Sequence, residues 1–158
     1  MPKALIATDG SGYAIDAAKR AKELLAPGVQ YTLLTVEPPP VMPEAAPVIG
    51  LETVPITSPE AAEELTEAYR EEANESLDRT AAALGGSADS RERAARRVEY
   101  GDAATEITRV AREEGFDVIV VGSHGSGFVK RVLLGSVSQH LLHHAPCAVL
   151  VVQAHDQA

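Results

Sequence analysis

Short apolar runs alternate with segments of helical periodicity along this chain, and that alternation restricts the fold more than any other feature of the sequence. The run at 118–121, VIVV, has no charge and only β-branched residues, which is typical of a strand buried on both faces. Residues 4–7 and 148–152 have the same character, residues 31–36 are rich in β-formers, and residues 98–101 carry a weaker strand pattern. We therefore expect five short strands.

Helical segments separate these strands. The first is expected over residues 13–25, and the longest opens at Ser58-Pro59, where a capping side chain precedes a first-turn proline. A third is expected to begin at the cap Asp102 and to run to Glu114, with Gly115 as its terminator, and a fourth is expected around 135–143. Connections of this length allow crossovers between parallel strands, so we expect a doubly wound α/β fold with a parallel sheet covered on both faces.

One segment interrupts the alternation without ending it. Residues 37–57 hold six of the ten prolines and lack both helical and alternating periodicity, so we interpret them as one long loop. Because strands and helices continue to alternate after it, we expect residues 1–158 to form a single domain.

Charge and composition exclude several classes of partner. The chain has 14 basic and 23 acidic residues, a net charge of −9, so it should repel both a nucleic-acid backbone and an anionic membrane. We therefore expect no nucleic-acid partner and no membrane partner. The single cysteine, Cys147, excludes an intramolecular disulfide, and no apolar run is long enough for a signal-peptide core or a bilayer span. A cytoplasmic location is expected.

The strongest candidate for chemistry is a glycine-rich loop after the strand at 117–122. Gly122 and Gly125 permit a tight turn and close approach to a ligand, while Gly135 and Ser136 present amides at the positive end of a helix. Such an arrangement favours phosphate, and the hydroxyl of Ser138 could add a donor. The alternative is that the turn and the helix start require these residues without any ligand. The ordinary P-loop is excluded, because residues 128–129, FV, stand where Lys and Ser or Thr are required.

A second candidate loop follows the first strand. Gly10-x-Gly12 resembles the start of a dinucleotide fingerprint, but Ile15 stands where a small residue is needed. Asp9 could bind a ribose hydroxyl or simply cap the turn beside Ser11.

The histidines are weaker candidates for a functional site than the two loops. His140 and His144 lie four residues apart on one helix face, but no third ligand is evident, and we predict no metal site formed by the protein alone. His124 is a candidate for a phosphate contact or a solvated loop residue.

Together the two loops resemble the universal stress protein family, in its nucleotide-binding type. The family pattern Gly-x2-Gly-x9-Gly-Ser/Thr is matched by Gly122, Gly125, Gly135 and Ser136, and the Asp-Gly-Ser opening is matched by residues 9–11. The resemblance implies the strand order 3-2-1-4-5, a homodimer through the last strand, and ATP with Mg²⁺ or Mn²⁺ held through the phosphates. The implied site residues are Ala7, Thr8, Asp9, Val36, Val121, Gly122, His124, Gly125, Gly135, Ser136, Val137 and Ser138.

The resemblance also implies roles within that site. Asp9 would face the ribose, Val36 would line the adenine pocket, and the glycine loop with Ser136 and Ser138 would hold the triphosphate. No catalytic residue is predicted, because the sequence contains no nucleophile elbow, no spaced carboxylate pair and no base placed to activate water. The favoured function is an ATP-binding regulatory protein with at most slow hydrolysis. The alternatives are an α/β interaction protein with a purely structural glycine loop and a small nucleotide-transforming enzyme.

Overall fold

The computed structural model describes residues 1–39, 58–84, 94–125 and 134–153. The strands are β1 (Lys3–Ala7), β2 (Gln30–Glu37), β3 (Ala95–Tyr100), β4 (Val118–Gly122) and β5 (Ala148–Val152). The helices are α1 (Gly12–Leu24), α2 (Pro59–Ala83), α4 (Ala103–Glu114) and α5 (Ser136–His144). The alternation expected from the sequence is confirmed in these elements.

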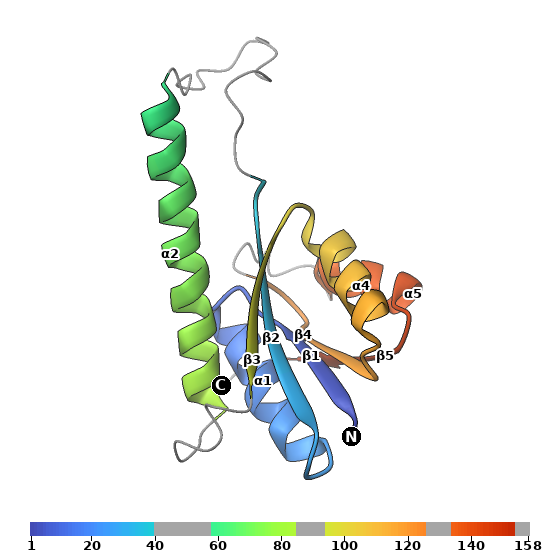
Figure 1. Ribbon diagram of the computed structural model, residues 1–158. Coiled ribbons are helices and arrows are strands. Elements are labelled where there is room, and N and C mark those ends of the chain that lie inside the picture. The colour runs from blue at the N-terminus through green and yellow to red at the C-terminus, as the bar shows by residue number, and fades with distance from the viewer. Residues whose placement is uncertain (40–57, 85–93, 126–133, 154–158) are drawn as a thin grey trace.

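The strands form one parallel sheet in the order β3-β2-β1-β4-β5 (Figure 1). Helices α1 and α2 pack on one face around Ile6, Leu33 and Val120. Helices α4 and α5 pack on the other around apolar residues that include Leu5 and Leu34. Neighbouring residues of one strand thus enter opposite cores, which explains the continuous apolar runs. The predicted doubly wound fold and its strand order are confirmed.

Helix ends follow the predicted caps. Ser58 Oγ accepts from the Ala61 amide at 3.2 Å, and Asp102 Oδ1 accepts from the Thr105 amide at 2.9 Å, so each side chain satisfies an orphan donor of its helix. Hydrogen bonding to Thr105 also lowers the pKa of the Asp102 carboxyl. Gly115 ends α4 in the left-handed conformation, with φ 64°.

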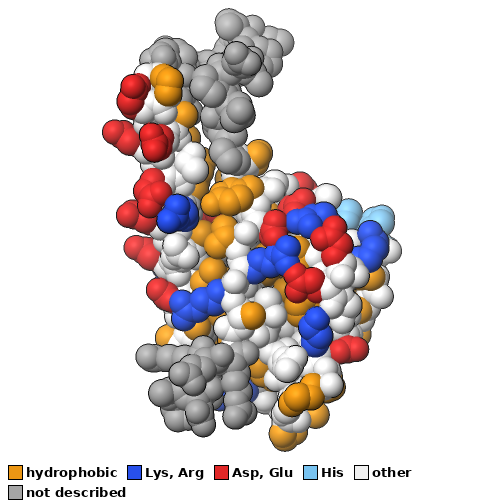
Figure 2. Space-filling view, in the orientation of Figure 1, with side chains coloured by type: hydrophobic (Ala, Val, Ile, Leu, Met, Phe, Trp, Pro, Cys, Tyr) orange, Lys and Arg blue, Asp and Glu red, His pale blue; other side chains and the backbone are white. Residues whose placement is uncertain are grey.

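The start of β3 was predicted wrongly. The strand begins at Ala95 and includes Arg96 and Arg97, which the sequence pattern placed before it. These arginines pair with carboxylates of other elements, Arg96 with Asp78 and Arg97 with Glu114, as well as with Glu99 on the same strand. Figure 2 shows the resulting mixture of positive and negative side chains over β3 and α4. Because β3 is an edge strand, charged side chains suit it.

Several sequence expectations fall on residues that the structure does not describe. Strand β2 extends to Glu37, one residue beyond its predicted end and inside the proposed proline-rich loop, while residues 40–57 of that loop lie outside the described residues. Gly85-Gly86, where the longest helix was expected to end, and residues 126–133, between the glycines of the candidate loop, lie outside them as well. Within the described ranges, no helix is both long and apolar enough to span a bilayer.

Candidate functional site

A cavity of about 590 Å³ opens at the carboxyl ends of β1, β2 and β4, where parallel sheets commonly bind ligands. All twelve residues that the resemblance implied line this cavity, although they come from four separate segments of the chain. The structure adds lining residues that the sequence reasoning missed: Ala14, Leu34, Ala103, Ile107, Leu134 and Gln139. Leu34 was detectable, because it lies two positions before Val36 on the same face of β2.

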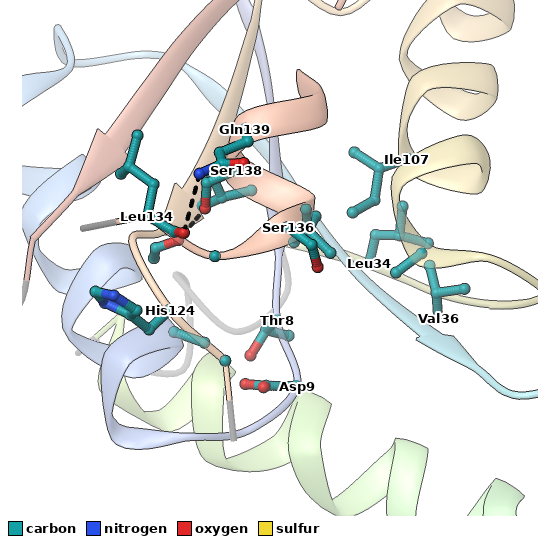
Figure 3. Close-up of a pocket in the computed structure, with 18 residues that line it drawn as sticks. Thr8, Asp9, Leu34, Val36, Ile107, His124, Leu134, Ser136, Ser138 and Gln139 are labelled. Atoms are coloured by element: carbon teal, nitrogen blue, oxygen red, sulfur yellow. Dashed lines mark hydrogen bonds between the residues drawn. The ribbon is translucent and has the colours of Figure 1, made fainter. Parts of the chain in front are cut away.

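The two ends of the cavity differ in polarity. Figure 3 shows Leu34, Val36 and Ile107 at one end, and Thr8, Asp9 and His124 at the other. Leu34 and Ile107 are 0% and 3% exposed, so the apolar end is part of the sheet's core. A ligand with a flat apolar ring at one end and polar groups at the other matches this division.

Close packing explains two of the glycines in the loop. A Cβ on Gly122 would lie 3.1 Å from the backbone carbonyl group of Tyr13, and one on Gly135 would lie 3.2 Å from the carbonyl oxygen of Ser123. Neither glycine has a positive φ. Gly122 was expected to permit a tight turn and close approach to a ligand, and Gly135 to present an amide; at both positions the missing side chain lets neighbouring backbones approach each other.

Gly125 is different, because it faces a side chain of the site. A Cβ at this position would lie 3.0 Å from Oδ2 of Asp9 and would meet no backbone atom of the described residues within 4 Å. The two loops that carry the motif therefore face each other at this point.

The start of α5 corrects two predicted donors. The Gly135 amide donates to the carbonyl oxygen of Ser123 at 2.7 Å, so that amide is used inside the loop. The Ser138 hydroxyl donates to the carbonyl oxygen of Gly122 at 2.8 Å, and it too holds the loop. The first intrahelical bond runs from Gln139 to Gly135, so the amides of residues 136–138 precede it at the positive end of the helix. These amides can bind an anion.

Asp9 caps the turn, one of the two roles that the sequence left open, and it also lines the cavity. Its Oδ1 accepts from the Ser11 amide at 3.0 Å, and Ser11 Oγ in turn accepts from the Ala14 amide at 3.3 Å as the N-cap of α1. The other carboxylate oxygen is the one nearest to Gly125. Asp9 is exposed and lines the cavity, so its carboxylate closes the turn and still faces the cavity.

Glu37, at the end of β2, does not line the cavity. Partial burial and the nearby carboxylate of Glu72 raise the pKa of the Glu37 carboxyl, and Asp9 adds to the effect. In the described parts of the chain, no three side chains form a group that could hold a metal ion.

His124 lines the cavity, whereas the other described histidines and Cys147 do not. His124 lies 2.9 Å from Ser123 Oγ through Nδ1, and its ring centroid is 5.8 Å from that of Tyr13. The rings of His140 and His144 stack at 4.3 Å, and neither lines the cavity. Burial raises the pKa of the Cys147 thiol, which favours its unreactive form.

The geometry of the glycine loop and the strand order invite comparison with known proteins. The sequence model of the universal stress protein family matches residues 1–153. This chain belongs to the universal stress protein family. Among curated relatives, a universal stress protein of Methanothermobacter thermautotrophicus is 51% identical over 53 residues, which are 34% of this chain and 36% of that protein. The match to this curated relative thus spans about a third of its length.

Solved structures extend the comparison to the whole fold. The structure of MJ0577, a universal stress protein of Methanocaldococcus jannaschii, superimposes with a TM-score of 0.73 and 28% identity, covering 99% of this chain and 98% of that one. A universal stress protein in complex with cAMP has a TM-score of 0.58 and 23% identity, with 96% and 95% covered. An Arabidopsis thaliana family protein with AMP bound has a TM-score of 0.61 and 16% identity, with 99% and 94% covered. At 23% and 16% identity, the last two comparisons show a shared fold only.

Proposed function

We propose that this universal stress protein is an ATP-binding regulatory protein and that the cavity at the carboxyl ends of β1, β2 and β4 holds the nucleotide. One observation carries the proposal: an apolar pocket end and a set of helix N-terminal amides share one cavity of about 590 Å³, a size suited to a nucleotide. Two fold relatives, crystallised with cAMP and with AMP, support an adenine nucleotide.

The division of the cavity orients the ligand. The adenine would lie at the end formed by Leu34, Val36 and Ile107, where apolar side chains can contact both faces of a flat ring. The ribose would lie at Asp9, and the phosphates would accept from the amides at the start of α5, beside Gly125. In this pose the ligand spans the two ends of the cavity.

Mg²⁺ or Mn²⁺ fits this arrangement as a partner of the phosphates rather than of the protein. The described residues hold no group of three His, Cys, Asp or Glu side chains that could bind a metal ion, while Asp9 places a carboxylate at the polar end. A divalent cation would neutralise phosphate charge there. Since the sequence contains no nucleophile elbow and no carboxylate pair at a defined spacing, we propose regulation by nucleotide binding, with hydrolysis slow at most.

The observation on Gly122 and Gly135 favours a second candidate, an interaction protein that binds no nucleotide. Both glycines have a structural explanation in backbone packing that requires no ligand. Gly125 favours nucleotide binding, because no backbone atom of the described residues would lie within 4 Å of a Cβ at this position.

Nucleotide retention tests the proposed function. Mass spectrometry of the denatured purified protein should detect an adenine nucleotide, and calorimetry with ATP and Mg²⁺ on nucleotide-free protein should give a dissociation constant of about 1 μM, equivalent to about −8 kcal/mol. Multiple-turnover release of phosphate should be negligible over minutes. Absence of bound nucleotide together with no heat at millimolar ATP would favour the interaction protein, and rapid turnover would favour the nucleotide-transforming enzyme.

We also propose a homodimer through β5, which lies at an edge of the sheet. Val151→Lys should favour the monomer, because a charge would have to be desolvated at the joined edge. Leu24→Lys, at an α1 side chain that is 55% exposed, is the matched control and should leave assembly unchanged. Sedimentation of the wild type as a monomer at micromolar concentration would contradict the dimer. We also propose that residues 1–158 form a single domain and that the protein is cytoplasmic.

A further inference from the structure

A chain of hydroxyl hydrogen bonds joins the β1–α1 turn to helix α2. The Gly10 amide donates to Thr8 Oγ1 at 3.0 Å, and Thr8 Oγ1 lies 2.7 Å from Thr80 Oγ1. The Thr80 hydroxyl donates to the carbonyl oxygen of Ser76 at 2.8 Å. Thr8 and Thr80 are 72 positions apart in the sequence, so this contact exists only because α2 packs on the sheet beside β1.

The positions of the hydroxyl hydrogens in this series of hydrogen bonds follow from counting donors and acceptors. A threonine hydroxyl has one hydrogen, and that of Thr80 is used on Ser76. Thr8 must therefore donate to Thr80 and accept from Gly10, which gives every hydroxyl a donor and an acceptor role. Thr8 and Thr80 are 6% and 0% exposed, so water cannot readily replace either bond.

Ser76 makes a second connection to the same turn. Its hydroxyl donates to the carbonyl oxygen of Asp9 at 3.3 Å, and the side chain is 2% exposed. Arg79 contacts that hydroxyl at 3.4 Å. Helix α2 thus holds the backbone of the turn on both sides of Asp9, although neither Ser76 nor Thr80 lines the cavity.

We propose that Thr80 and Ser76 are positioning residues for Asp9, so that α2 is part of the ligand-binding machinery without touching the ligand. The local bond from the Ser11 amide to Asp9 Oδ1 closes the turn. It does not fix the position of the turn relative to the cavity, so contacts with neighbouring elements must do so. The hydroxyl contacts with α2 supply that placement. This inference rests on the proposed function for its effect on nucleotide affinity, but the placement of the turn can be measured without any nucleotide.

The test compares Thr80→Val, which keeps the shape and removes the hydroxyl, with Thr80→Ser, which keeps the hydroxyl. Calorimetry should show ATP affinity reduced about five- to tenfold by Thr80→Val, since one buried hydrogen bond is worth about 1 kcal/mol. Thr80→Ser should stay within about twofold of the wild type. Ser76→Ala should resemble Thr80→Val, which protects the test against poor folding of one variant.

A double-mutant cycle separates positioning from general destabilisation. If Thr80 acts through Asp9, Thr80→Val should change affinity by less than about twofold in an Asp9→Ala background. The same loss in both backgrounds, or equal affinities for Thr80→Val and Thr80→Ser, would overturn the proposal.

Amide exchange separates this proposal from the proposed function. In nucleotide-free protein, Thr80→Val should accelerate exchange of the Gly10 amide, whose acceptor is Thr8 Oγ1. If the wild type binds no nucleotide, the ATP assignment fails, and the exchange rate still decides whether α2 places the turn. Unchanged exchange at Gly10 would overturn the placement itself.

Discussion

Gly125→Asp should eliminate ATP binding. The added Cβ would lie 3.0 Å from Oδ2 of Asp9, and the new carboxylate would stand where phosphate approaches the glycine loop. Two charges about 4 Å apart near a protein surface interact by up to about 4 kcal/mol. We expect at least about a hundredfold loss of affinity by calorimetry, which corresponds to about 2.7 kcal/mol.

Gly125→Asn is the matched control, because it has nearly the same shape without the charge. It should lose affinity through steric contact alone and bind ATP at least about tenfold more tightly than Gly125→Asp. Both variants should still fold, since Gly125 has no positive φ and no backbone atom of the described residues would lie within 4 Å of the added Cβ. Equal ATP affinity of the wild type and Gly125→Asp would show that the phosphates do not bind at this loop.

Gly10→Ala should destabilise the fold by roughly 3 kcal/mol. Gly10 has φ +71°, where a side chain costs about 1–2 kcal/mol. Its Cβ would also lie 2.7 Å from Ser76 Oγ and 2.9 Å from Ser76 Cβ, and overpacking of this kind costs about 1–3 kcal/mol. Chemical denaturation should show a lower midpoint with a slope close to that of the wild type.

Gly12→Ala, two positions later, is the control for that variant. A Cβ there meets nothing within 4 Å, and Gly12 is the first residue of α1. Alanine should therefore be neutral or stabilise the protein by up to about 1 kcal/mol through helix propensity. If Gly10→Ala were as stable as Gly12→Ala, the close contact between the turn and α2 would be wrong, and so would the reasoning about Thr80.

Local patterns were sufficient for most of the elements. The β-branched run of β4 and the apolar run of β5 identified buried strands, and Ser58, Asp102 and Gly115 marked helix ends, because caps act through neighbours within one turn. The start of β3 was missed because Arg96 and Arg97 look like loop residues until Asp78 and Glu114 are placed beside them. The strand order came from the resemblance and not from periodicity, which carries no information about neighbours.

For the site, the sequence by itself determined the two motif loops and, through the family resemblance, twelve residues that converge on one cavity. Only the tertiary structure added Ala103 and Ile107, assigned the Gly135 amide to Ser123, and brought Thr80 to Thr8. The physical reason is how far apart in the sequence the interacting residues lie. Caps, periodicity and turn residues depend on atoms a few positions apart, whereas each of these contacts joins elements that meet only after the sheet has assembled.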